Sequence, residues 1–108
     1  MKFVNLTPHK INVFASDGVT PLIGIEPSGT VARVAVQRTI RKTIDDIPVY
    51  ATVYGKADGV PLAPFGVMYI VSALVRQAMP ERSDILSPGQ LVRDNAGQPI
   101  GCIGLDSN

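Results

Sequence analysis

Hydrophobic and polar residues alternate along two stretches of the chain with the period of two that is typical of half-buried β-strands. The first stretch is residues 31–38, and the second, which is more regular, is residues 47–54. Residues 38–46 between them are polar and are expected to form an exposed connection or a strand end. The faces expected to pack in the core are Ala32, Val34 and Val36 in the first stretch and Ile47, Val49, Ala51 and Val53 in the second.

Turn-forming residues recur along the whole chain. Ten glycines and nine prolines divide the sequence, which is the pattern of short strands joined by turns. Turns are expected at Asp17-Gly18, Pro27-Ser28-Gly29, Ser87-Pro88-Gly89 and Asn95-Ala96-Gly97, and a long loop at residues 55–66. Further strands are expected at residues 2–6, 11–15, 22–25, 67–71, 91–94 and 100–103.

One short helix is expected after the continuous apolar run 67–71, which itself resembles a strand covered on both faces. Ser72 can cap a helix that continues to Met79 and ends before Pro80. Its buried stripe would be Leu74, Val75 and Ala78. The whole pattern predicts a single domain, residues 1–108, that is mainly β: a compact sheet or small barrel of six to eight short strands with one short helix.

Composition narrows the classes of function. The formal net charge is only +1, so the chain has no long-range field to attract nucleic acid or an anionic membrane. A single cysteine, Cys102, cannot form an internal disulfide. The N-terminus lacks the apolar segment of a secretory signal, and the longest apolar run is about half of a membrane span. We therefore expect a cytoplasmic protein.

Recognised catalytic and cofactor motifs are absent. The chain has no phosphate-binding loop, no dinucleotide-binding glycine pattern and no paired Cys-x-x-Cys, and one histidine with one cysteine cannot complete a zinc site. No cofactor and no metal is therefore expected. His9 can be a hydrogen-bond donor to a ligand, a general base, or a histidine satisfied by a neighbouring carbonyl. Cys102 can pair with His9 as a nucleophile, but a free cysteine is more often a small buried hydrophobe.

Arginines and acidic residues gather between positions 76 and 94. Because the planar guanidinium binds two phosphate oxygens at once, this set could hold a nucleotide whose base stacks on Tyr50, Tyr54 or Tyr69. The alternative is that Arg–Asp salt bridges fasten the helix to the last hairpin. The residues concerned are Arg76, Arg82, Asp84, Arg93 and Asp94.

Four segments together resemble a known group of proteins. They are Asn5-Leu6-Thr7-Pro8-His9, then Tyr69-Ile70-Val71-Ser72 followed by Leu74-Val75, then Leu91-Val92-Arg93-Asp94, and finally Ile100-Gly101-Cys102. This combination resembles small proteins encoded by bacteriophages, prophages and other mobile elements of bacteria. The resemblance implies an accessory role in the host cell, such as countering a defence by sequestering a nucleotide signal, and supplies no functional residues.

The favoured hypothesis is a binding protein, not an enzyme, that sequesters a small nucleotide-like ligand. Small proteins often build such sites between subunits, so a homo-oligomer is expected. The alternatives are a protein-interaction module, which inhibits a host protein or serves as a small virion or assembly component, and an enzyme that uses His9. The expected ligand-binding residues are Thr7, His9, Ser72, Arg76, Arg82, Asp84 and Arg93.

Overall fold

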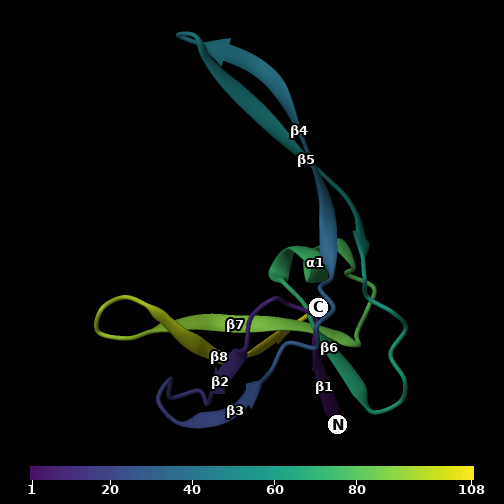
Figure 1. The fold of residues 1–108 in the computed structure, drawn as a ribbon, viewed down its shortest axis with the longest axis vertical. Coiled ribbons are helices and arrows are strands. Elements are labelled where there is room, and N and C mark those ends of the chain that lie inside the picture. The colour runs from purple at the N-terminus through teal and green to yellow at the C-terminus, as the bar shows by residue number, and fades with distance from the viewer.

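The computed structural model describes residues 1–108 and has two visible parts, a barrel-shaped body and a long hairpin that projects from it (Figure 1). The predicted fold class, mainly β with one short helix, is confirmed. The strands of the body are β1 (Lys2–Asn5), β2 (Ile11–Phe14), β3 (Pro21–Ile25), β6 (Val67–Ile70), β7 (Ile85–Arg93) and β8 (Pro99–Ser107); the hairpin is β4 (Arg33–Ile44) and β5 (Ile47–Asp58); the helix is α1 (Ala73–Ala78).

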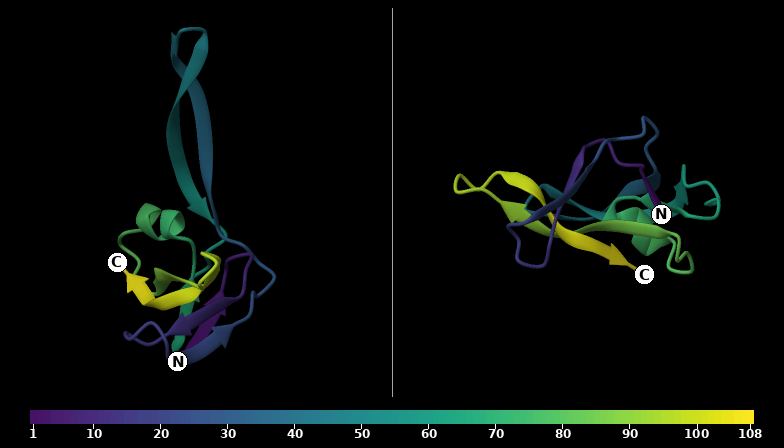
Figure 2. Two further views of the ribbon diagram at one scale, coloured as in Figure 1. Left: turned by 90° about the vertical axis from the view of Figure 1, so that its left-hand side faces the viewer. Right: turned by 90° about the horizontal axis from the view of Figure 1, so that it is seen from below.

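The six strands of the body form one sheet that nearly closes on itself. Their order is β1-β6-β7-β8-β2-β3. The two outer strands meet at one point, where Asn5 bridges Pro27 and the Ser28 amide donates to the Asn5 carbonyl at 2.9 Å. Figure 2 shows the resulting curvature from the side and from below. Closure of this kind leaves few free strand edges in the body.

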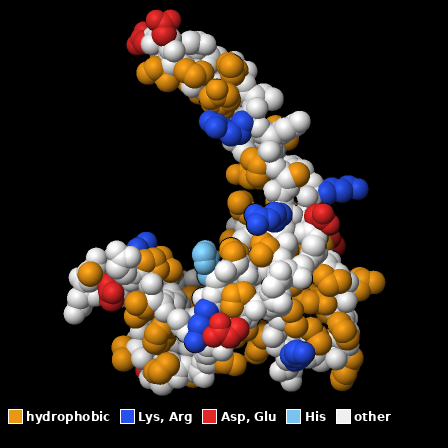
Figure 3. Space-filling model, in the orientation of Figure 1, with side chains coloured by type: hydrophobic (Ala, Val, Ile, Leu, Met, Phe, Trp, Pro, Cys, Tyr) orange, Lys and Arg blue, Asp and Glu red, His pale blue; other side chains and the backbone are white.

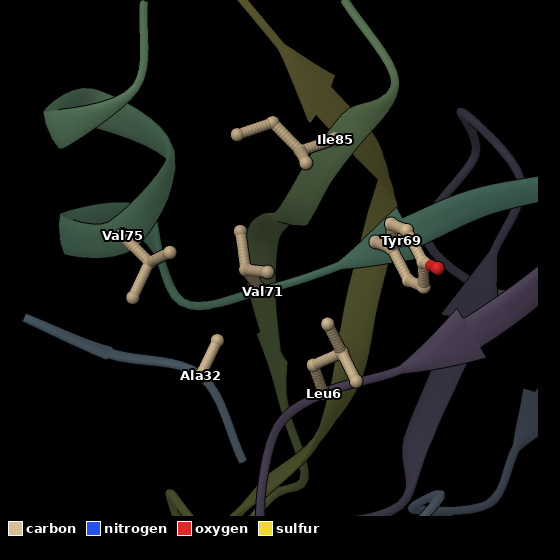
Figure 4. Packing of buried hydrophobic residues seen from close by; sticks show 6 residues of the cluster. All are labelled: Leu6, Ala32, Tyr69, Val71, Val75 and Ile85. Carbon is tan, nitrogen blue, oxygen red and sulfur yellow. The ribbon is translucent and has the colours of Figure 1, made fainter. Parts of the chain in front are cut away.

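Strand β6 is buried on both faces, as its continuous apolar run predicts. On the inner face, Ile70 packs with a cluster drawn from β2, β3 and β8. On the outer face, Tyr69 belongs to a second cluster that lies beneath α1 (Figure 4). The inner cluster is Ile11, Val13, Ile25, Ile70 and Cys102; the outer cluster is Leu6, Ala32, Tyr69, Val71, Val75 and Ile85.

Helix α1 begins as predicted and buries less than predicted. Ser72 is the N-cap, and its hydroxyl accepts a hydrogen bond from the Val75 amide at 3.3 Å. Only Val75 is buried; Leu74 is 48% exposed and Ala78 is also exposed. The prediction of a three-residue buried stripe was therefore wrong, because a helix of six residues contacts the body through a single turn.

The β4–β5 hairpin, here called the arm, contradicts the predicted core faces. Its strands continue to Ile44 and Asp58. Residues 38–44, predicted as an exposed connection or a strand end, are exposed strand; residues 55–58 of the predicted loop are also strand, and residues 59–66 lie outside any strand as predicted. Asp45-Asp46 forms the turn, with positive φ at both residues. The arm leaves the body, so its alternating face finds no sheet to cover it. Ala32 and Val34 pack at the outer cluster, whereas Val36, Ile47 and Val53 are 52–63% exposed and Val49 and Ala51 are half-buried.

Ser87-Pro88-Gly89 was predicted to be a turn and instead lies within β7. A Cβ on Gly89 would come within 2.1 Å of the Ile103 carbonyl oxygen, so glycine at this position lets β7 approach β8 closely. Proline is tolerated beside it because the ladder between β6 and β7 ends at Leu86, which leaves that edge of β7 free. The two strands consequently run longer than the short hairpin that the sequence predicts.

Candidate functional site

An open cavity of about 600 Å³ lies where the loop between β1 and β2, the start of α1 and the β7–β8 hairpin meet. Figure 3 shows this side of the molecule, which is hollowed between the β7–β8 hairpin and the rest of the body, with the single histidine exposed there. Thr7 and His9 come from the β1–β2 loop, and Ser72 comes from a segment more than sixty residues away in sequence. The other polar residues of the lining are Lys10 and Asn12; its apolar residues include Pro8, Ile11, Leu91, Ile100 and Cys102.

The buried side chain of Asn5 fixes the shape of the β1–β2 loop. Its amide donates to the carbonyls of His9 at 2.8 Å and Ile25 at 3.1 Å. Its Oδ1 accepts from the Thr7 amide at 2.9 Å and the Thr7 hydroxyl at 2.6 Å. Because one side chain satisfies both ends of the loop, Thr7 and His9 are held in place at the edge of the cavity.

The residues of the cavity lining combine exposed apolar surface with one cationic hydrogen-bond donor, Lys10. Leu91 and Ile100 are 48% and 41% exposed, so a bound molecule could cover them. The Lys10 ammonium lies 3.2 Å from Glu26, and both side chains are half exposed or more. An exposed salt bridge of this kind contributes little stability, so an anionic ligand can compete with Glu26 for Lys10.

Cys102 belongs to the cavity lining, but its thiol is unreactive. Its thiol donates to the Asn12 carbonyl at 3.7 Å. Burial raises the pKa of the Cys102 thiol above its usual value of 9.0. Since the thiolate is the nucleophilic form, this thiol stays protonated and unreactive at neutral pH. No hydrogen bond joins it to His9.

The arginines expected to hold phosphate lie outside the cavity. Arg82 forms a salt bridge with Asp84 and donates to the carbonyls of Val60 and Pro61. The guanidinium lowers the pKa of the Asp84 carboxyl, chiefly through a hydrogen bond. Arg82 and Asp84 thus form one local bridge. The bonds from Arg82 to the two carbonyls join the segment after α1 to the loop after β5.

Arg76 and Arg93 are also engaged in contacts of the fold. Arg76 donates from Nε to the Ser87 hydroxyl at 2.8 Å and from its terminal nitrogen to the Ser107 carbonyl. Arg93 donates to the Gly97 carbonyl at the turn of the last hairpin, and it forms no salt bridge with Asp94. The structure therefore gathers Thr7, His9 and Ser72 at the cavity, and it places Arg76, Arg82, Asp84 and Arg93 elsewhere.

Sequence reasoning missed the residues that surround these three. Lys10 and Asn12 lie one and three residues after His9, and this closeness to the loop was the available signal. Ile100 and Leu91 had no signal, because only the closure of β8 against β2 and β7 brings them to the same cavity. The tyrosines are not at the cavity, since Tyr69 is in the core and the other two are on the arm.

The helix of the structure is too short to span a membrane. No three His, Cys, Asp or Glu side chains come together in a group able to hold a metal ion. Comparison of the chain with family models, with curated proteins and with solved structures finds no match.

Proposed function

We propose that this protein binds a small nucleotide-like ligand in the cavity and sequesters it without chemical change. The observation that carries the proposal is the convergence of Thr7, His9 and Ser72, from two distant segments, on one cavity of about 600 Å³. Pockets that enclose small molecules typically measure about 300–1,000 Å³ and combine apolar walls with a few polar groups. In this proposal the chain is a phage-type anti-defence protein that acts in the bacterial cytoplasm.

The chemistry of the lining supports a ligand with a planar apolar part and an anionic part. Leu91 and Ile100 offer exposed apolar surface to a base. Lys10 and His9, which also belong to the lining, offer donors to phosphate or sugar oxygens. Thr7 and Ser72 add hydroxyls that can read the edge of a base or a ribose. The anionic part would therefore be held by Lys10 and not by the arginines.

Sequestration without catalysis is supported by the state of the one nucleophile at the cavity. The Cys102 thiol has a raised pKa and is bonded to a main-chain carbonyl. His9 has no carboxylate partner among the hydrogen bonds of the loop that would orient it as a base. A ligand in this cavity meets groups suited to hold it.

Isothermal titration calorimetry with ADP-ribose, a cyclic mononucleotide and a cyclic dinucleotide tests the proposal. We expect one of these probes to bind, and we expect His9→Ala and Lys10→Ala each to weaken binding about tenfold, as loss of a charge-assisted hydrogen bond does. Lys2→Ala, which removes an exposed lysine outside the cavity, should bind as the unmodified chain does. Equal affinity for all four proteins would contradict this site.

One observation favours a second candidate function, a protein-interaction module that inhibits a host protein or serves in a virion. The arm exposes large apolar side chains over most of its length, and surfaces of this kind mark contacts with other proteins. A defined complex with a bacterial protein, lost on Ile40→Lys and retained on His9→Ala, would favour this candidate over ligand binding.

A further inference from the structure

The lining of the cavity carries very little charge. Lys10 is its only lysine, it contains no arginine, and none of its residues is acidic. The remaining ionisable groups of the lining are His9 and the Cys102 thiol, which burial keeps protonated. The lining therefore offers an anion one permanent positive charge, that of the Lys10 ammonium.

The position of the Lys10 side chain limits how much negative charge it can hold. The side chain lies over Gly24 of β3, where a Cβ would come within 2.8 Å of Lys10 Cε. Its ammonium lies 3.2 Å from the carboxylate of Glu26, which is not part of the lining. One negative charge on a ligand can replace Glu26 as the partner of the ammonium. A second charge would lie near the Glu26 carboxylate without a cation of its own, which is unfavourable.

The rest of the body does not supply a second cation. Arg76, Arg82 and Arg93 lie outside the lining, and each donates to oxygen atoms of the fold. Outside residues 33–58, which form the arm, the chain holds five lysines and arginines and six aspartates and glutamates. The body therefore adds no positive field around the cavity. The charge that a ligand meets there depends chiefly on the pair of Lys10 and Glu26.

We propose that the cavity selects ligands with a single negative charge, of the class of cyclic mononucleotides, over ligands that carry two. This inference rests on the function proposed above and narrows its class of ligand. A cyclic mononucleotide has one phosphodiester, which Lys10 can pair, and a base that can cover Leu91 and Ile100. ADP-ribose and cyclic dinucleotides carry two charges, so one would stay unpaired. A cavity of about 600 Å³ suits small molecules of many sizes, so charge is the property that discriminates.

Isothermal titration calorimetry with adenosine, cyclic AMP and AMP isolates the effect of ligand charge. The three probes share a base and a ribose, and they carry no charge, one negative charge and two, the last because the second pKa of a phosphate monoester is about 6. We expect cyclic AMP to bind about tenfold more tightly than adenosine or AMP. Lys10→Ala should lower the affinity for cyclic AMP to that for adenosine. The corresponding guanine probes, measured in parallel, make the result independent of the base.

Glu26→Gln tests the cause of the selectivity. Without this carboxylate, the affinity for AMP should rise more than the affinity for cyclic AMP. Glu81→Gln, which removes the same charge from an exposed position outside the cavity, is the matched control and should change neither affinity.

Two sets of results would overturn the inference, and they differ in what they leave standing. If AMP or ADP-ribose binds as tightly as cyclic AMP and its binding depends on Lys10, the limit on charge is wrong and the proposed nucleotide site remains. The same holds if Glu26→Gln does not raise the affinity for AMP. If none of the nucleotides binds, the inference fails together with the function on which it rests.

Discussion

The buried amide of Asn5 determines the shape of the loop that carries Thr7 and His9 to the cavity. Its four hydrogen bonds bind the loop at both ends and fasten it to Ile25 of β3. In the sequence, Asn5 is one polar residue at the end of a short apolar strand, and nothing there distinguishes it from a surface residue. Its role depends on contacts with β3, twenty positions away, which pattern alone does not reveal.

Asn5→Ala should lower the free energy of unfolding by about 2–4 kcal/mol, because buried hydrogen-bonding groups then lose their partner. Urea unfolding of both proteins measures the difference. Asn95→Ala, at an exposed position in the turn of the last hairpin, is the matched control and should change stability by less than about 0.5 kcal/mol. A similarly small effect for Asn5→Ala would show that these bonds do not hold the loop.

Asp17 gives the β2–β3 turn a dependence on pH. A hydrogen bond from the Thr20 hydroxyl, with others from the Thr20 and Val19 amides, lowers the pKa of the Asp17 carboxyl from 3.8 to about 2. Since the folded pKa lies below the unfolded value, the carboxylate stabilises the turn above pH 3.8, and that stability is lost as the pH falls toward 2.

Thr20→Val should therefore raise the pKa of Asp17 toward 3.8, as followed by NMR titration of its side-chain carbonyl. Thr43→Val, on the arm, is the control and should leave the titration unchanged. An Asp17 midpoint that is the same in Thr20→Val and in the unmodified chain would show that the hydroxyl is not the main cause.

At the scale of elements, the local sequence pattern predicts strands that are buried on both faces and helix ends that are capped. It does not predict which face of a strand is buried when the covering residues are distant in the sequence. Strand β6 and the Ser72 cap follow from local pattern, and both are confirmed. The alternation in β4 and β5 is equally clear and correctly predicts strands. It cannot say whether the apolar face meets this chain or another, and here it leaves the body.

The close approach of β7 and β8 provides a test at this scale. Gly89→Ala should lower the free energy of unfolding by about 3 kcal/mol, because its Cβ would overlap the main-chain carbonyls of Ile103 and Gly104. Gly24→Ala is the matched strand control: its Cβ would meet the flexible end of Lys10, so we expect a loss of less than about 1 kcal/mol. Thermal unfolding compares the two, and equal losses would contradict a special role for Gly89.

The molecule as a whole is more extended than its length requires. Its radius of gyration is 16.6 Å, whereas a compact domain of this length has about 13 Å, and the arm accounts for the difference (Figure 1). Only 13 residues are buried, so the chain leaves both the arm and the cavity walls for contacts beyond itself. Of the cavity, Thr7, His9 and Ser72 could be predicted from sequence. Leu91 and Ile100 could not, since only barrel closure unites them with the β1–β2 loop.

Native mass spectrometry of the protein purified from bacterial cytosol tests the central claim, that the cavity holds a nucleotide-like ligand intact. After denaturation, we expect release of an unmodified nucleotide-like molecule at one per chain, and its absence from protein that carries His9→Ala and Lys10→Ala together. A chain that remains free of ligand after exposure to cyclic nucleotides and ADP-ribose derivatives would contradict the claim.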